Sequence, residues 1–219
     1  MERIKNRISR RNALKTLLSG VAVLGTTASV FGAKKMIKPW QFINHKDKMA
    51  NVDGTPLQFI PKTPKDPNPT VDEFKKYPRC PYCGMVRKMW SHTRYLIHYD
   101  NDQADGTCSI HCAAISLSLN LDLHPKAIYV GDAGAKGKIK PLVLVDDATF
   151  VVGSKNPGTM TAESKWAYGS DGSADAAIKK TGGKKVGFDE ALTASYMSMA
   201  KDTLMIRKKR AKKRSMEQS

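Results

Sequence analysis

Residues 95–130 read YLIHYDNDQADGTCSIHCAAISLSLNLDLHPKAIYV, and their pattern predicts one complete strand–strand–helix–strand unit. Residues 95–99 have the aromatic and β-branched composition of a strand, and a turn of Asp and Asn leads to a second strand that ends near Cys108. Ser109 is a suitable N-cap for a helix whose apolar residues are Ala113, Ala114, Leu117 and Leu121. Residues 127–130 complete the unit as a third strand.

A second, similar unit is expected further along the chain. Residues 142–145 and 150–152 are predicted to pair across Asp146-Asp147, and residues 165–168 form another short strand. A helix over 173–181 stops at Gly182-Gly183, residues 185–188 close the unit, and a terminal helix covers 189–205. The fold class is therefore α+β, a tandem pair of small strand–strand–helix–strand units with a C-terminal helix.

All four cysteines of the chain lie within the first unit and the segment just before it, in two close pairs. Cys80 and Cys83 form a Cys-x2-Cys motif, and after 24 intervening residues Cys108 and Cys112 form a Cys-x3-Cys motif at the expected helix start. We call each cysteine pair a hook. Two such hooks can direct four sulfur atoms to one point, as a thiolate metal site requires. The helix start also favours ionised thiols, because its N–H groups and dipole stabilise negative charge.

Two other uses of the cysteines have to be weighed. Structural disulfides are an alternative, because an exported protein meets an oxidising compartment. A Cys-x-x-Cys thiol–disulfide catalyst is another, although such motifs follow a strand of a parallel sheet and here a proline-rich segment precedes the first pair.

Soft donor atoms surround the cysteines in the sequence. Met85 follows the first pair, and Met160 lies in the loop Asn156-Pro157-Gly158-Thr159-Met160. Thioether and thiolate ligands together favour Cu(I), a soft ion, whereas structural zinc rarely uses methionine. Met89 is expected to serve in packing and His111 to act either as a ligand or as a neighbour of the helix cap. His92 and His98 are expected to be surface or strand residues.

The N-terminal residues resemble an export signal. Residues 1–33 contain Arg10-Arg11 followed by a short apolar run, the pattern of a twin-arginine signal. The run is too short and too weakly apolar for a confident membrane span. We therefore expect a periplasmic protein exported by the twin-arginine route.

Two more segments flank the domain expected over 78–205. Residues 34–77 are rich in proline and predict a connector, with one helical turn over 71–76 in which Thr70 and Glu73 form a capping box. Residues 206–219 are expected to be a disordered basic tail, because like charges repel and remain solvated.

Most of the net charge of +17 lies at the two ends of the chain. Residues 1–33 hold six basic and one acidic side chain, and residues 207–219 hold seven and one. An exported protein meets anionic lipid rather than nucleic acid, so we expect no nucleic-acid partner and association of the tail with a membrane surface.

The run Cys80-Pro81-Tyr82-Cys83-Gly84-Met85 resembles the signature of the NosL family, accessory proteins of nitrous oxide reductase. The resemblance continues over most of residues 78–205, in the stretches Gly106-Thr107-Cys108-Ser109, Ile128-Tyr129-Val130-Gly131-Asp132, Phe150-Val151-Val152-Gly153-Ser154, Gly158-Thr159-Met160-Thr161 and Gly182-Gly183-Lys184-Lys185-Val186-Gly187-Phe188-Asp189-Glu190. It implies a tandem of small strand–strand–helix–strand units, similar to part of organomercurial lyase.

The resemblance also implies a function and a set of ligands. Family members bind Cu(I) in the bacterial cell envelope and help to deliver it to nitrous oxide reductase. Cys83 and Met85 match the family's Cys-Gly-Met, and Met160 matches the methionine of its Gly-x-Met-Gly loop. Three features depart from the family: no cysteine can carry a lipid anchor, the basic tail has no counterpart, and Cys112 with His111 makes the second pair similar to the treble-clef TRASH motif.

The sequence therefore predicts a copper(I) metallochaperone that is not an enzyme, since no nucleophile, base and orienting acid form a pattern. Its partner would be a recipient cuproenzyme of the nitrous oxide reductase type. The candidate metal ligands are Cys80, Cys83, Met85, Cys108, Cys112 and Met160. The alternative is a structural zinc-binding, treble-clef-like interaction module, in which the metal only holds a hairpin together.

Overall fold

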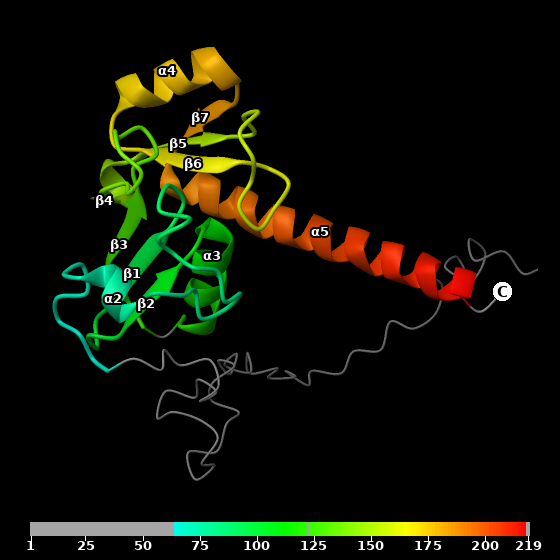
Figure 1. Cartoon of the computed structure of the whole chain (residues 1–219), viewed down its shortest axis with the longest axis horizontal. Coiled ribbons are helices and arrows are strands. Elements are labelled where there is room, and N and C mark those ends of the chain that lie inside the picture. Colours follow the sequence, from blue (N-terminus) through cyan, green and yellow to red (C-terminus); the bar gives the residue numbers. More distant parts are fainter. Residues whose placement is uncertain (1–63, 122, 218–219) are drawn as a thin grey trace, which may run out of the picture. The chain divides into compact units, whose positions relative to one another are not determined.

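The computed structural model describes residues 64–121 and 123–217. They contain two small antiparallel sheets, two short helices of which one is a 3-10 turn, a ten- to eleven-residue helix against each sheet and a long C-terminal helix (Figure 1). The expected export signal over residues 1–33 lies outside the described residues, as does the first part of the connector. The elements are α2 (Glu73–Lys76), β1 (Tyr95–Tyr99), β2 (Ala104–Thr107), α3 (Ile110–Leu119), β3 (Pro125–Gly131), β4 (Leu142–Leu144), the 3-10 turn η3 (Val145–Asp147), β5 (Thr149–Val152), β6 (Lys165–Tyr168), α4 (Asp171–Thr181), β7 (Lys184–Val186) and α5 (Phe188–Glu217).

The two sheets confirm the expected tandem of strand–strand–helix–strand units. The first sheet has the order β2-β1-β3-β4 and the second the order β6-β5-β7. In both units the first strand is central, the second strand pairs with one of its edges, and the strand after the helix pairs with the other. The fold class is therefore α+β, as predicted.

The start of the second unit differs from the expectation. Strand β4 does not pair with β5 but joins the first sheet, where Val143 lies opposite Val130 of β3. The physical reason is that β5 is central, so β6 and β7 already occupy both of its edges. Asp146-Asp147 is part of η3, which carries the chain from one sheet to the other rather than forming a hairpin.

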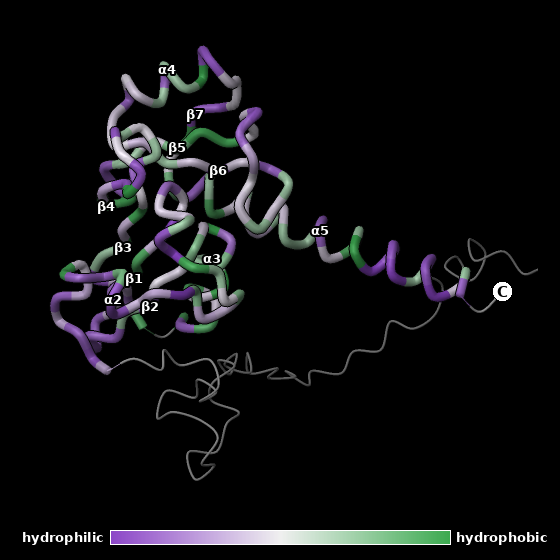
Figure 2. Tube along the Cα trace, viewed as in Figure 1, coloured by the Kyte–Doolittle hydropathy of each residue, from purple (hydrophilic) through white to green (hydrophobic). Residues whose placement is uncertain are grey.

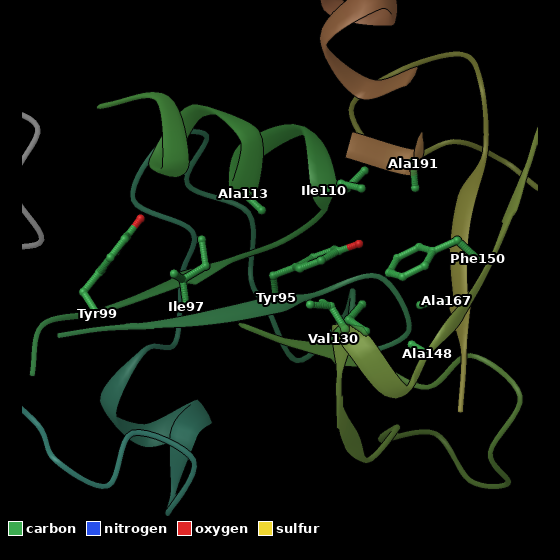
Figure 3. Packing of buried hydrophobic residues seen from close by; sticks show 11 residues of the cluster. Tyr95, Ile97, Tyr99, Ile110, Ala113, Val130, Ala148, Phe150, Ala167 and Ala191 are labelled. Carbon is green, nitrogen blue, oxygen red and sulfur yellow. The ribbon is translucent and has the colours of Figure 1, made fainter. Parts of the chain in front are cut away.

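The main hydrophobic core joins the two units (Figure 3). One buried cluster contains Tyr95 and Val130 of the first sheet, Phe150 of the second sheet, Ile110 of α3 and Ala191 of α5. Burial of apolar surface from both sheets and both helices in a single cluster stabilises them as one domain.

The C-terminal helix is longer than expected. α5 continues without interruption from Phe188 to Glu217, so residues 206–217 are helical and the expectation of a disordered tail is wrong there. Figure 2 shows that its last turns are strongly hydrophilic. The segment contains mainly Lys, Arg, Ala and Met, which are strong helix formers, and a helix already nucleated by packing extends at little cost. No helix in the described part of the chain is long and apolar enough to cross a membrane.

The end of the connector belongs to the folded domain. Glu73 and Tyr77 are buried, and α2 begins after Asp72, which has a positive φ of 50° and gives no side-chain cap. The predicted capping box with Thr70 is therefore not formed. Glu73 instead binds Arg87 at 2.8 Å and Arg94 through its Nε at 2.8 Å, since two buried guanidinium groups attract the carboxylate more strongly than a backbone N–H does.

Candidate metal centre

The first cysteine pair lies on a tight turn between two short extended segments. Cys80 N–H donates to the Met85 carbonyl at 2.9 Å, and Gly84 N–H donates to the Cys80 carbonyl at 2.8 Å. Gly84 has a φ of +75°, a conformation that residues with a Cβ adopt only at a cost. The turn holds the side chains of Cys80 and Cys83 on the side of the domain where β2 meets α3.

The second pair lies where β2 leads into α3. Cys108 directly follows β2, and Cys112 is in the first turn of α3, so one short connection carries both thiols. Both side chains are almost fully buried, at 0% and 1% exposed, as is Cys80 at 1%. Cys83 is the partly exposed member of the set.

The four sulfur atoms converge. All lie within 4.8 Å of one another, with 3.3 Å between the Sγ atoms of Cys83 and Cys108 and 3.8 Å between those of Cys108 and Cys112. No disulfide joins them, and all four thiols are free. Sulfur ligands about 2.3 Å from a tetrahedral ion are about 3.8 Å apart, so the arrangement fits a single thiophilic ion.

Arg87 connects the segments that carry the two cysteine pairs, Cys80/Cys83 and Cys108/Cys112. Its guanidinium group is fully buried and donates to the carbonyls of Tyr77 (2.8 Å), Tyr95 (3.0 Å) and Thr107 (3.2 Å). Tyr77 precedes the first hook, and Thr107 precedes Cys108. Burial lowers the pKa of Arg87, and the adjacent Glu73 carboxylate raises it. This single side chain therefore links the segments that precede the two cysteine pairs.

A buried polar network supports the first hook from a second direction. Tyr82, which lies between the two cysteines of the turn, donates its hydroxyl to Asp105 on β2. Ser116 of α3 donates to the same carboxylate oxygen at 2.6 Å, and the hydroxyls of Ser116 and Tyr99 are 2.7 Å apart. Burial raises the pKa of Asp105, and the hydrogen bonds from Ser116 and Tyr82 partly offset that effect.

The close approach of the thiols makes them ionise unequally. Hydrogen bonds from the Cys108 and Cys112 thiols lower the pKa of Cys80. The pKa of Cys112 is raised by its hydrogen bonds to Cys108 and Cys80 and by burial. A second or third thiolate in this space therefore needs a bound cation to balance its charge.

The two predicted methionine ligands occupy different positions. Met85 is partly buried and packs against the cluster of Cys80, Cys108 and Cys112. Met160 is 42% exposed, has a φ of 69° and lies outside that cluster. Its loop is nevertheless anchored nearby, because the hydroxyl groups of Thr159 and Thr93 are 3.1 Å apart and Thr93 donates to the Cys108 carbonyl at 3.0 Å.

Of the three histidines considered, only His111 has a recorded contact with a cysteine of the cluster. His111 Nδ1 lies 4.0 Å from the sulfur of Cys112, and burial lowers its pKa. His92 lies beside Trp166, with 4.7 Å between ring centroids, and His98 lies in β1 with its Nε2 3.2 Å from Asp102. Met89, expected to serve in packing, is instead 75% exposed.

Sequence reasoning did not find Arg87, Asp105 or Tyr82 as supports of the site. Gly106 is the one residue whose identity indicates the position of Arg87 once the structure is known. A Cβ at residue 106 would lie 2.8 Å from the Arg87 guanidinium carbon, so only glycine fits there. Nothing in the local pattern relates that glycine to an arginine 19 residues away.

The fold and the four convergent thiols define a small α+β protein with a four-cysteine cluster that could hold a metal ion. The NosL family model matches residues 70–196, which is more than half of the chain. The chain belongs to the NosL family. The expectation that the chain is not an enzyme agrees with its membership of this family.

Comparison with solved structures gave related chains. The copper chaperone NosL from Shewanella denitrificans is 27% identical, covers 51% of this chain and 87% of its own, and superposes with a TM-score of 0.43. The apo-NosL protein from Achromobacter cycloclastes is 23% identical, covers 43% of this chain and 82% of its own, and has a TM-score of 0.32. A comparison with curated proteins gave no match.

Proposed function

We propose that this protein is a copper(I) metallochaperone of the cell envelope. The observation that carries the proposal is the convergence of four free thiols within 4.8 Å in a chain of the NosL family. Thiolates are soft ligands and match a soft d10 ion such as Cu(I). The Met85 thioether packs against the same cluster and adds a ligand type that Cu(I) accepts and structural zinc rarely uses.

The exposure of the cysteines indicates how the ion would leave. Cys83 is partly exposed, whereas Cys80, Cys108 and Cys112 are buried. A ligand of the recipient protein can therefore approach the ion beside Cys83, form its bond and release that sulfur while the buried thiols still hold the ion. Transfer by successive ligand exchange avoids free copper at every step.

Cu(I) affinity tests this proposal. Anaerobically purified protein would be titrated with bathocuproine as a competing Cu(I) chelator, and we expect a 1:1 complex. Cys83→Ser and Met85→Leu should each weaken it, with the larger loss for Cys83→Ser. Met89→Leu is the matched control, because Met89 is 75% exposed and lies outside the thiol cluster. An unchanged Cu(I) affinity of Cys83→Ser would rule out the proposed site.

A structural zinc site is the second candidate, and the burial of three thiols favours it. A closed tetrahedral zinc–thiolate site is stable and releases its ion slowly. Zinc would then be recovered at one ion per chain, and its exchange for added Cu(I) would be slow. Copper retained as Cu(I), or zinc readily replaced by Cu(I), supports the chaperone instead.

The proposed recipient is a cuproenzyme of the nitrous oxide reductase type, and the proposed location is the periplasm. Export through the twin-arginine route rests on Arg10-Arg11 and the apolar run in residues 1–33. Substitution of both arginines by lysine should leave the protein in the cytoplasm of an expressing bacterium. Transfer of Cu(I) from the loaded chain to the copper-free reductase, followed by recovery of the enzyme's absorption spectrum, tests the recipient.

A further inference from the structure

The last turns of α5 have no role in the metal centre. The first part of the helix packs on the domain: Ala191, Ser195 and Ser198 are buried, and the Tyr196 hydroxyl donates to the Ala114 carbonyl of α3 at 2.9 Å. Residues 203–217 are all exposed. We name residues 203–217 the basic arm.

The basic arm is a concentrated positive charge. Seven of the eight residues from 207 to 214 are Lys or Arg, and successive residues of a helix are separated by 100°. The cations therefore surround the helix on every side. Among the described residues, only Lys213 of this run has an acidic partner, Glu217 at 3.5 Å, so the charge is hardly neutralised within the protein.

Exposed apolar side chains lie directly before the cations. Leu204 is 58% exposed, Met205 45% and Ile206 44%. A polyanion such as DNA attracts the cations but gains nothing from these three side chains. An anionic bilayer attracts the cations to its headgroups and accepts the apolar side chains at the boundary with the acyl chains.

We propose that the basic arm binds the surface of anionic phospholipid membranes. It lies on the surface rather than crossing it, because its charge density forbids insertion. Since α5 is one continuous helix whose first part packs on α3, and α3 carries Cys112, membrane binding also holds the metal centre near the bilayer. This inference goes beyond copper delivery and does not depend on it.

Sedimentation with vesicles tests the proposal in the full chain. We expect binding to vesicles of phosphatidylglycerol and phosphatidylcholine, much weaker binding to phosphatidylcholine alone, and release as salt is raised. The variant Lys208→Gln/Lys209→Gln/Arg210→Gln should bind about a hundredfold more weakly, because each cation near the surface contributes roughly a fivefold factor. The control Lys136→Gln/Lys179→Gln/Lys180→Gln removes the same charge from exposed lysines elsewhere and should bind within about twofold of the parent.

A second variant tests the contribution of the apolar residues. Leu204→Ser/Met205→Ser/Ile206→Ser should lower vesicle binding while the steep salt dependence remains. Equal losses in the two charge variants would overturn the proposal, because they would show an effect of net charge alone. Tighter binding to duplex DNA than to vesicles at the same phosphate concentration would also overturn it and assign the arm to nucleic acid. Both arm variants should retain the parent's Cu(I) affinity, which separates this result from the test of the metal site.

Discussion

Replacement of Arg87 by methionine tests whether one buried cation holds the two cysteine hooks in place. Methionine keeps an apolar stem of similar length and removes the guanidinium group. Arg87 is 0% exposed and makes hydrogen bonds to Glu73, Tyr77, Tyr95 and Thr107. The substitution therefore leaves three carbonyl groups and part of one carboxylate without their partner.

The expected loss of unfolding free energy is about 4 kcal/mol. Removal of one partner from a buried ion pair costs about 3–5 kcal/mol. The lost hydrogen bonds to carbonyls add to this, but Arg94 still binds Glu73 and the contributions of neighbouring groups are not additive. A loss of this size is a large share of the roughly 5–15 kcal/mol that stabilises a typical domain. We also expect at least about tenfold weaker Cu(I) binding, as for other residues that orient metal ligands.

Urea unfolding of the reduced, metal-free protein measures the first effect, and competition with bathocuproine measures the second. Lys88→Met is the matched control, because Lys88 is the exposed neighbour of Arg87 and loses the same charge. It should change stability by less than about 0.5 kcal/mol. If Arg87→Met costs less than about 1 kcal/mol and leaves Cu(I) affinity unaltered, Arg87 does not connect the hooks and the reasoning is refuted.

Three further predictions follow from other parts of the structure. Gly84→Ala should lower the free energy of unfolding by about 1–2 kcal/mol in urea, because its φ of +75° is unfavourable for alanine even though nothing lies within 4 Å of the new Cβ. Gly172→Ala is the control: its Cβ is equally uncrowded but lies within α4, so the change should be neutral or stabilising. Partial burial opposes ionisation of Asp66, but hydrogen bonds from Lys76 and Tyr77 hold its pKa below the usual value. Asp66→Asn should therefore destabilise the protein by about 1 kcal/mol at neutral pH, and the difference from the parent should disappear as pH falls through that lowered pKa; a pH-independent difference would contradict this. Addition of Cu(I) or Zn²⁺ at about a hundred times its Kd should raise stability by roughly 2.7 kcal/mol, measured as a higher Tm that a chelator reverses, and Cys112→Ser should lose most of the gain.

The local pattern was sufficient for most secondary structure and for the cysteine site. Alternating and apolar runs located β1, β3, β5, β6 and the helices, because these elements bury a regular set of side chains. The spacing of the two cysteine pairs predicted that their thiols converge, since β1 and β2 between the pairs form a hairpin that brings them together. In contrast, the pairing of β4 and the packing of residues 64–77 were predicted wrongly. Both depend on which sheet edge or buried charge is available, and that is a property of the whole fold.

By itself, the sequence determined the tandem of two units, the identity of the four thiols and the membership of a metal-binding family. These follow from periodicity, turn residues and motif spacing, all of which are local. Only the tertiary structure decided that Arg87 ties Thr107 to Tyr77, that Asp105 supports Tyr82 and that Cys83 is the partly exposed thiol. Those contacts join residues far apart in the chain. They stabilise the protein only after folding has removed water from the charged and polar groups, which then need hydrogen-bond partners within the protein.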